Sequence, residues 1–372
     1  MKIVFAIKNL ANAVGGAERV LCMICNDLVQ KGHQVTIITF DSENSRPFYF
    51  LHKAVNIENL SLGNSTDKAQ TFITLLRILK LRKVLKAKRP DIAVGFMHSM
   101  FIPLSFSLIG TGIPVIGSEH IVPEHYKSRR LEFFLFKISS FFMRSITVIS
   151  TSIMESYPKC IKDKMVVISN PVMKPSDDFA YSSSERKNIH FLSVGRLSLQ
   201  KDHKTLIDAF NVLYKEYQNC RLKIIGEGEL RAQITKQIVS YNLENVISLP
   251  GVTSKIEIEY KQADIFVLSS IYESFGLVTA EAMSYGLPVI GFKDCQGTNE
   301  LIEDGKTGLL IDNNGKRSEL LAEGMKRLVI DESLREKLSQ NGREFIKNSF
   351  SVSHITEQWE CLFKKVVNNK DV

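Results

Sequence analysis

Two glutamates, Glu273 and Glu281, flank a short segment whose residue types suit a nucleoside diphosphate. The apolar run 265–270 predicts a strand, and residues 277–285 predict a helix. Glu273 then lies on the strand-to-helix loop, and Glu281 lies inside the helix. Because the first turn of a helix has unbonded N–H groups and a partial positive charge, it suits a phosphate. A carboxylate on each side can accept hydrogen bonds from hydroxyl groups, as a nucleotide-sugar requires.

For an isolated pair of glutamates, a solvated acidic loop ahead of an ordinary helix is the simpler interpretation. A second loop argues against it, because Gly195, Arg196 and Lys201 follow the apolar strand predicted at 189–194. The glycine permits close backbone approach, arginine can bind phosphate oxygens in bidentate fashion, and lysine supplies a point charge.

Two further segments lie between predicted strands and helices in the N-terminal half. Gly15 and Gly16 stand between the strand at 2–7 and an amphipathic helix. His120 follows the apolar run 114–117, and a histidine at the carboxyl end of a strand is well placed to reach a sugar hydroxyl or a phosphate.

These segments resemble the retaining glycosyltransferases of family four, of the kind that make bacterial surface polysaccharides, which have the two-domain architecture called GT-B. The resemblance covers nearly the whole chain, and its C-terminal part is the more specific. The matching segments are 15–18, 118–120, 195–197 with Lys201, 226–228, and Glu273 with Glu281.

The resemblance implies a role for each part of the site. Glu281 should hold the ribose hydroxyls, Glu273 should contact the transferred sugar, and Gly228 and Val252 should line the nucleotide pocket. The candidate catalytic residues are His120, Arg196, Lys201 and Glu273, and the candidate donor-binding residues are Gly15, Gly16, Gly195, Gly228, Val252, Ser274, Phe275, Gly276, Leu277 and Glu281.

We expect neither a metal nor a cofactor at this site. Arg196, Lys201 and the helix N-terminus already supply positive charge for the leaving phosphate, and no Asp-x-Asp motif of metal-dependent glycosyltransferases is present. The eight histidines show no metal-ligand spacing. Cys22 and Cys25 lie three residues apart on a predicted helix without a second pair, which favours buried thiols.

Near-continuous apolar runs alternate with helical patterns along the chain, which predicts an α/β fold with parallel, doubly wound sheets. By resemblance, this is GT-B, with two Rossmann-like domains facing each other across a cleft. We expect an acceptor-binding domain at 1–175 and a donor-binding domain at 185–350, with a linker within 170–187. The final helix, about 352–368, should cross back to the N-terminal domain.

Composition limits the partners and the compartment. The 372 residues are 44% hydrophobic and carry a net charge of +8, which favours anionic partners. No nucleic-acid motif is evident, no segment is apolar and long enough to span a membrane, and the first apolar run is too short for a signal peptide. We therefore expect a cytoplasmic protein.

Two basic helices are predicted in the N-terminal half, at 80–89 and 127–144. The second is rich in phenylalanine and has two interpretations. Apolar residues nearly encircle it, which favours a core helix, whereas its basic ends favour contact with an anionic membrane surface. Membrane contact would place the protein on the inner face of the plasma membrane.

The function expected from these observations is a metal-independent hexosyltransferase that transfers a sugar with retention of anomeric configuration. A UDP-sugar is the expected donor, because uridine donors are frequent in the family. A growing surface glycan or a polyprenyl-linked saccharide is the expected acceptor. The alternatives are synthesis of a soluble glycoside and a non-catalytic paralogue that binds nucleotide-sugars. A nucleotide-sugar 2-epimerase of the same architecture lacks support from the spacing of Glu273 and Glu281.

Overall fold

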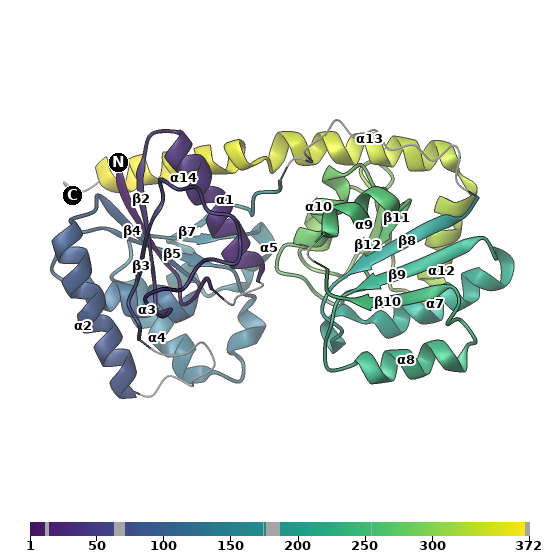
Figure 1. Ribbon diagram of the computed structural model, residues 1–372, viewed down its shortest axis with the longest axis horizontal. Helices are drawn as coiled ribbons and strands as arrows, with labels where there is room; N and C mark the ends of the chain where they lie inside the picture. Colours follow the sequence, from purple (N-terminus) through teal and green to yellow (C-terminus); the bar gives the residue numbers. More distant parts are fainter. Residues whose placement is uncertain (12–14, 63–70, 174, 176–186, 254, 369–372) are drawn as a thin grey trace. The chain divides into compact units, whose positions relative to one another are not determined.

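A computed structural model of the chain describes residues 1–11, 15–62, 71–173, 175, 187–253 and 255–368. The chain forms two compact units (Figure 1). Unit 1 consists of Met1–Pro171 with Val352–Val372, and unit 2 consists of Val172–Ser351. Most of the predicted linker, residues 174 and 176–186, lies outside the described residues.

Unit 1 is built on a seven-stranded parallel sheet with the order β3-β2-β1-β4-β5-β6-β7. The order reverses direction beside β1, as in doubly wound folds. The strands are β1 (Lys2–Ala6), β2 (Gln34–Thr39), β3 (Asn56–Asn59), β4 (Ile92–Phe96), β5 (Val115–Glu119), β6 (Ser145–Val148) and β7 (Met165–Val167). Strands β4 and β5 are buried along their whole length, which explains the apolar runs 92–96 and 114–117.

Helices cover both faces of this sheet, with α1 and α14 on one face and α2, α3 and α4 on the other (Figure 1). The helices of unit 1 are α1 (Gly16–Gln30), α2 (Thr71–Lys88), α3 (His98–Ser107), the 3-10 helix η1 (Pro123–Tyr126), α4 (Arg130–Ser140), α5 (Thr151–Ser156), α6 (Lys159–Lys162) and α14 (Val352–Asn368). Cys22 and Cys25 are buried within α1, as predicted.

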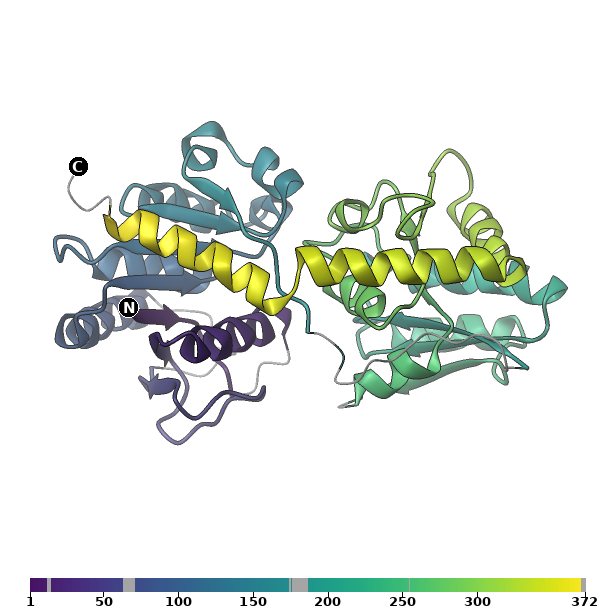
Figure 2. The ribbon, with the colours of Figure 1, turned by 90° about the horizontal axis from the view of Figure 1, so that it is seen from above.

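The final helix, α14, belongs to unit 1, which confirms that the end of the chain crosses back to the N-terminal part (Figure 2). Trp359 is only 2% exposed. Its ring lies 6.3 Å from that of Phe5 in β1 and 6.2 Å from that of Phe96 in β4. Burial of a tryptophan and its aromatic neighbours is a large apolar contribution, so α14 is an integral part of this core.

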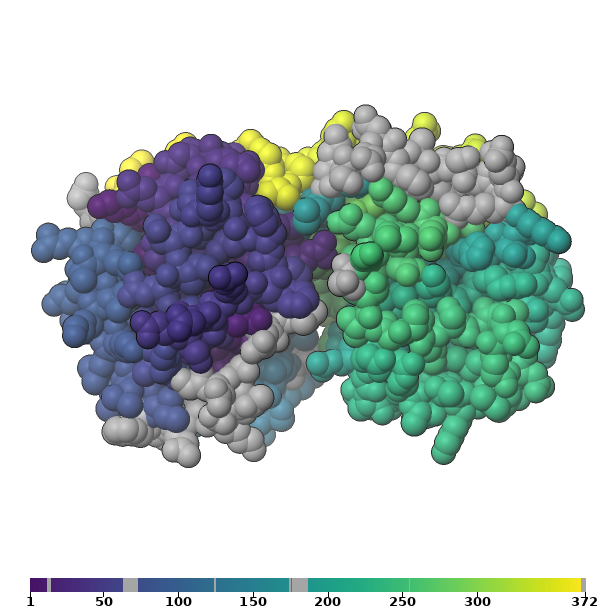
Figure 3. All heavy atoms as spheres, viewed as in Figure 1, coloured from purple at the N-terminus to yellow at the C-terminus, as the bar shows by residue number. Residues whose placement is uncertain are grey.

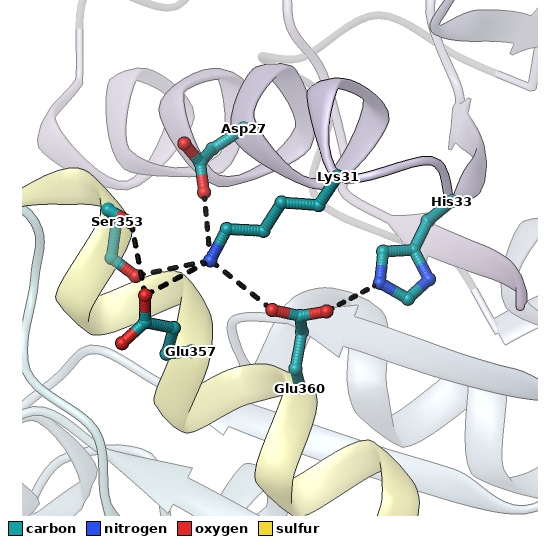
Figure 4. A network of polar contacts seen from close by, with 6 residues as sticks. All are labelled: Asp27, Lys31, His33, Ser353, Glu357 and Glu360. Atoms are coloured by element: carbon teal, nitrogen blue, oxygen red, sulfur yellow. Dashed lines mark hydrogen bonds and ion pairs between the residues drawn. The ribbon is translucent and has the colours of Figure 1, made fainter.

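A polar network at the edge of this contact joins α14 to the end of α1 (Figure 4). Lys31 Nζ lies 3.2 Å from Glu360 Oε2 and 3.5 Å from Asp27 Oδ2, and His33 Nε2 lies 2.8 Å from Glu360 Oε1. Partial burial opposes ionisation of Glu360, but the hydrogen bonds from His33 and Lys31 outweigh it and lower the pKa of this carboxyl group. The network therefore fixes the position of α14 along α1.

Unit 2 has a six-stranded parallel sheet with the order β10-β9-β8-β11-β12-β13. Its strands are β8 (Ile189–Val194), β9 (Cys220–Ile225), β10 (Ile247–Gly251), β11 (Ile265–Val267), β12 (Val289–Phe292) and β13 (Leu309–Ile311). Its helices are η2 (Leu199–Lys201), α7 (His203–Glu216), α8 (Arg231–Ser240), α9 (Ile256–Gln262), α10 (Leu277–Ser284), α11 (Thr298–Leu301), α12 (Arg317–Ile330) and α13 (Glu332–Ser349). Two Rossmann-like units confirm the predicted fold class.

The surface of unit 1 carries several large apolar side chains. The segment between β2 and β3 lies on the face of unit 1 that Figure 3 shows, and Phe48 and Phe50 in this segment are exposed. On α4, Leu131 and Phe134 are 70% and 58% exposed, and only Phe136 among its large apolar side chains is fully buried. The helix ends at Ser140, short of the predicted residue 144. Its remaining large apolar side chains, Phe133, Leu135 and Ile138, are half-buried, so one side of the helix packs on the unit and the other side is exposed. None of the described helices combines the length and the apolar run that a bilayer span requires.

Candidate active site

In unit 2, a lysine and a glutamate from two different loops meet at the carboxyl ends of β8 and β11. Lys201 Nζ donates to Glu273 Oε1 at 2.5 Å, and Ser270 Oγ donates to the same oxygen at 2.6 Å. The side chains of Lys201 and Glu273 are only 15% and 10% exposed. A mostly buried ion pair of this kind can exchange its internal contact for contacts to a charged substrate.

The backbone around Lys201 explains how it reaches Glu273. A Cβ on Gly195 would lie 3.0 Å from Cδ and Cε of Lys201, so the glycine leaves space for the lysine side chain to cross the end of β8. Asp202 adopts a left-handed conformation, with φ of 44°, and caps α7 by accepting hydrogen bonds from Thr205. The cap fixes the point at which η2 ends and α7 begins, and so the direction of the lysine.

Glycines bring the loops after β8, β9 and β10 into direct backbone contact. Gly226 N donates to Gly251 O at 2.9 Å, and Leu197 N donates to Glu227 O at 2.9 Å. A Cβ on Gly228 would lie 2.4 Å from Leu197 O, and one on Gly226 would lie 2.0 Å from the oxygen of Gly195. These positions therefore accept only glycine without movement of the backbone. Val252, which follows this cluster, is 67% exposed.

The predicted strand-to-helix turn is also present. Gly276 has φ of 81° and precedes α10, so its left-handed conformation starts the helix at Leu277. Ser274 and Leu277 are half-buried and Phe275 is buried. Gly297 holds the neighbouring loop against this turn, because a Cβ there would lie 2.4 Å from Glu273 O. The sequence interpretation did not include Gly297 or Ser270. Of these two residues, only Ser270 could have been found from the sequence, because it is a polar residue at the end of an apolar run.

Glu281 lies in the second turn of α10 and is only 7% exposed. Tyr260, on α9, donates its hydroxyl to Glu281 Oε2 at 3.0 Å. This tyrosine is buried and stacks on Tyr285, with 5.3 Å between the ring centroids. Sequence reasoning missed Tyr260, because nothing in its spacing from Glu281 indicates contact between the two helices.

Arg196 is exposed, and within the described part of the chain its guanidinium group makes no hydrogen bond or ion pair. It lies at the end of the same strand as Gly195, in the loop that leads to Lys201. The structure therefore brings Lys201 and Glu273 together and leaves Arg196 available to an anion from solvent.

His120 belongs to unit 1, where it follows β5 directly. Its ring stacks on Phe96 at 4.8 Å, and its Nε2 lies 2.9 Å from Ser118 Oγ, which accepts a hydrogen bond from Thr147. With Ser118 as the donor to Nε2, the ring proton is on Nδ1. Nδ1 is buried and has no partner among the described residues. Burial lowers the pKa of His120 to about 4, so at neutral pH it is an uncharged hydrogen-bond donor.

Glu119, next to His120, is fully buried. Its Oε1 accepts from the backbone N–H groups of His120 and Ile121, at 2.9 and 3.0 Å, and its Oε2 accepts from the Tyr126 hydroxyl at 2.5 Å. Burial raises the pKa of Glu119 to about 7 against the opposing effect of these bonds. Its contacts hold the turn after β5 and so the position of His120.

Gly15 and Gly16 also belong to unit 1, at the start of α1. Gly15 is the residue before the helix, and a Cβ there would lie 2.1 Å from Glu18 Oε2. The glycine therefore allows Glu18 to fold back over the first turn. The residues that precede it, 12–14, lie outside the described part of the chain.

The burial of His203, the first residue of α7, should make the free energy of unfolding depend on pH. This residue is 2% exposed, and burial, assisted by the charge of Lys201, lowers its pKa from 6.5 to about 4. Because the folded state favours the neutral imidazole, this stabilisation is complete above pH 6.5 and is lost as the pH falls toward 4, by on the order of 3 kcal/mol in total. We expect His203→Gln to reduce the loss of unfolding free energy between pH 7 and pH 5, measured by urea denaturation. Parallel pH profiles for the two proteins would contradict this expectation.

Comparison with known families identifies the chain. The family described as Glycosyltransferase Family 4 matches residues 14–173, and the family described as Glycosyl transferases group 1 matches residues 174–345. The two matches follow each other along the chain and divide it close to the boundary between units 1 and 2. The chain belongs to glycosyltransferase family four.

Relatives of this glycosyltransferase extend over its whole length. It is 29% identical over 370 residues to a Campylobacter jejuni enzyme named GalNAc-alpha-(1->4)-GalNAc-alpha-(1->3)-diNAcBac-PP-undecaprenol alpha-1,4-N-acetyl-D-galactosaminyltransferase, with 99% of each chain covered. It is 25% identical over 355 residues to the amylovoran biosynthesis glycosyltransferase AmsD of Erwinia amylovora, with 91% of this chain and 93% of the relative covered. The family-four chain is therefore an enzyme that transfers sugars.

Solved structures show the same GT-B fold. The lipopolysaccharide outer core galactosyltransferase WaaB superimposes with a TM-score of 0.73 at 18% identity, covering 98% of this glycosyltransferase and 100% of that chain. The Anabaena protein HepE in complex with UDP-glucose superimposes with a TM-score of 0.76 at 20% identity, with the same coverage. The predicted family and architecture are confirmed.

Proposed function

We propose that this glycosyltransferase moves a hexose from a UDP-sugar to a lipid-linked or surface glycan, with retention of anomeric configuration and without a metal at the donor phosphates. The observation that carries the proposal is the Lys201–Glu273 pair in the loops beside the N-terminus of α10. A lysine held by a carboxylate, an arginine and a helix N-terminus are three sources of charge stabilisation for a departing diphosphate.

In this proposal Lys201 leaves Glu273 when the donor binds and forms its ion pair with the donor phosphates instead. The lysine then stabilises charge that develops on the leaving phosphate, and Arg196 adds a bidentate contact from its exposed position. Glu273, released from the lysine, accepts hydrogen bonds from hydroxyl groups of the transferred sugar. The departing phosphate helps to deprotonate the acceptor on the same face of the sugar, so Glu273 is not assigned as a nucleophile.

The remaining candidates of unit 2 complete the donor site, and His120 of unit 1 is assigned a sugar hydroxyl. Glu281 accepts hydrogen bonds from the ribose, with Tyr260 fixing one of its oxygens. The glycine-linked loops at Gly228 and Val252 receive the nucleoside. His120 donates Nδ1–H to a sugar hydroxyl, since a neutral imidazole suits a hydroxyl better than it suits a phosphate.

The names of similar proteins support the donor and the acceptor. The Campylobacter relative is named as acting on an undecaprenol diphosphate-linked glycan, and the HepE structures contain UDP, UDP with glucose, or UDP-glucose. A lipid-linked acceptor favours catalysis at an anionic membrane surface. Synthesis of a soluble glycoside is the second candidate and needs no such surface.

The surface of α2 and α4 suits that membrane. Both helices cover the same face of the unit 1 sheet. Their exposed apolar side chains are Leu75, Leu76, Leu79, Leu131 and Phe134, with Phe141 and Phe142 directly after α4. Their exposed cations, with those of the adjoining turns, are Lys80, Lys83, Lys86, Arg89, Lys127, Arg129, Arg130, Lys137 and Arg144. Clustered cations beside apolar side chains are typical of peripheral membrane contacts.

We expect the protein to sediment with vesicles that contain phosphatidylserine at low salt, and to do so less as salt screens the cations. Phe134→Asp should weaken sedimentation at least about threefold, because it places a charge on the contact surface. Val239→Asp, at an exposed apolar position of unit 2, is the matched control and should change nothing. If the protein does not sediment even at low salt, the soluble acceptor becomes the better proposal.

Thermal unfolding of the pure protein with a panel of nucleotide-sugars, in buffer containing EDTA, tests the function. A ligand at a hundred times its dissociation constant should add about 2.7 kcal/mol of stability. We expect a UDP-sugar to stabilise the protein in EDTA and magnesium or manganese to add less than about twofold in affinity. Stabilisation only after metal addition would refute the metal-independent donor site. Binding without sugar transfer to any lipid-linked acceptor would favour the non-catalytic paralogue.

A further inference from the structure

Three side chains of unit 1 that have no role in the proposed donor site lie together beside β4. They are His98, the first residue of α3, His125 in η1 and Glu132 in α4. One ligand atom from each lies within 4.8 Å of the others. The imidazole rings of His98 and His125 are 5.4 Å apart, and His98 Nε2 is 3.3 Å from Glu132 Oε2.

The geometry of this group suits a tetrahedral cation. Two ligand atoms at about 2.0–2.2 Å from zinc, at the tetrahedral angle, are about 3.3–3.5 Å from each other. The measured separation of His98 Nε2 and Glu132 Oε2 matches that edge. The ligand atom of His125 lies within 4.8 Å of those of His98 and Glu132. It must move by only about 1 Å to reach the tetrahedral separation, and rotation of its side chain can supply this movement.

The electronic state of both histidines also fits. His98 Nδ1 and His125 Nε2 are buried and have no hydrogen-bond partner among the described residues. A buried imidazole nitrogen without a partner loses its hydrogen bond to water, and a cation at the group would supply a partner for His125 Nε2. A neutral imidazole has one ring nitrogen with a lone pair, and this is the nitrogen that binds a metal ion.

The surroundings provide the outer contacts that ligands need. Arg129 Nη1 lies 3.3 Å from Glu132 Oε1 and 3.5 Å from Glu132 Oε2, so the arginine contacts both oxygens of the carboxylate that faces His98. Tyr126 packs its ring against both histidines, at 5.4 and 5.5 Å between centroids. Outer partners of this kind orient metal ligands. The positive charge of Arg129 opposes a cation, so the site needs soft nitrogen ligands and gains little from charge alone.

We propose that His98, His125 and Glu132 bind a zinc ion that joins α3, η1 and α4. Two imidazoles and one carboxylate favour zinc over magnesium or calcium, which prefer sets of oxygen ligands. The ion would fix η1, whose Tyr126 donates to Glu119, the residue that holds the turn carrying His120. It therefore acts as a positioning site in unit 1, distinct from the donor phosphates assigned to unit 2.

Zinc titration calorimetry on the full-length protein, after treatment with a chelator and dialysis, tests the site. We expect one zinc per chain, a higher melting temperature with zinc, and a tetrahedral cobalt spectrum when cobalt replaces zinc. His125→Ala and the isosteric Glu132→Gln should each weaken zinc binding at least about tenfold, the lower limit for loss of even an outer partner. His354→Ala, an exposed histidine on α14, should bind zinc as the unaltered protein does.

Several outcomes would overturn the proposal. Absence of stoichiometric binding would do so, as would equal affinity in His125→Ala, Glu132→Gln and the unaltered protein. Loss of binding in His354→Ala would indicate an adventitious surface histidine. Cooperative thermal unfolding of His125→Ala, near the melting temperature of the metal-free unaltered protein, serves as the check on folding of unit 1. The zinc result is therefore independent of whether the proposed transferase activity is correct.

Discussion

Replacing Lys201 with alanine should lower the turnover of sugar transfer by about a hundredfold or more, comparable to removing one donor from an oxyanion hole. The ammonium group is the charge nearest to Glu273 and, in the proposed mechanism, moves to the leaving phosphate. Initial rates with a saturating UDP-sugar measure the effect. Lys204→Ala, at an exposed position three residues further along, is the matched control and should keep full activity.

The same variant leaves Glu273 without its cation, in a side chain that is only 10% exposed. Loss of one partner of a buried pair is destabilising, so a fall in activity must be separated from a fall in stability. The double variant Lys201→Met with Glu273→Gln removes both charges and should restore thermal stability without restoring turnover. Full activity in Lys201→Ala would rule out the phosphate role. Recovery of activity in the double variant would assign the lysine a purely structural one.

Glu281→Ala should weaken binding of UDP roughly 10- to 100-fold, because a charged hydrogen bond to a hydroxyl is worth about 1.5–3 kcal/mol. Tyr260→Phe should weaken it less, since it removes only the hydroxyl that orients Glu281 Oε2 at 3.0 Å. Calorimetric titration with UDP alone measures both. Glu319→Ala, at an exposed glutamate of unit 2, should bind UDP normally.

Glu273→Gln completes the comparison, because the proposal assigns this residue to the sugar and not to the nucleotide. It should bind UDP with nearly the affinity of the unaltered protein and transfer sugar slowly. If Glu273→Gln and Glu281→Ala weaken UDP binding to the same extent, the division of the two glutamates between sugar and ribose is incorrect.

The pattern of apolar runs was sufficient to predict the interior strands but not every edge strand. Strands β4 and β11 have continuous apolar sequences and are buried along their whole length. The edge strands β3, β7 and β13 were not predicted. Each is three or four residues long, and β3 is not fully buried at any position, so neither length nor hydrophobicity distinguished them from loops.

In the candidate site, too, some features could be predicted from the sequence and others could not. Glycines and charged residues at the ends of predicted strands can be found in a sequence, because parallel sheets gather such residues at one edge. The bond between Lys201 and Glu273, the tyrosine on Glu281 and the contact of Gly297 with Glu273 join residues up to 72 positions apart. No local period connects such residues, so only the fold could show which of them meet.

By itself, the sequence of this glycosyltransferase determined its alternation of strands and helices, its family and the chemical types available for a sugar nucleotide. These properties depend on local spacing and residue type. The tertiary structure decided which side chains contact one another and which of them are buried. It exposed Leu131 and Phe134 of α4, it gave His120 a neutral ring, and it placed His98, His125 and Glu132 together. Burial and ionisation depend on what surrounds a side chain in three dimensions. Those surroundings come from helices and strands that are far apart in the sequence, so no local sequence pattern shows them.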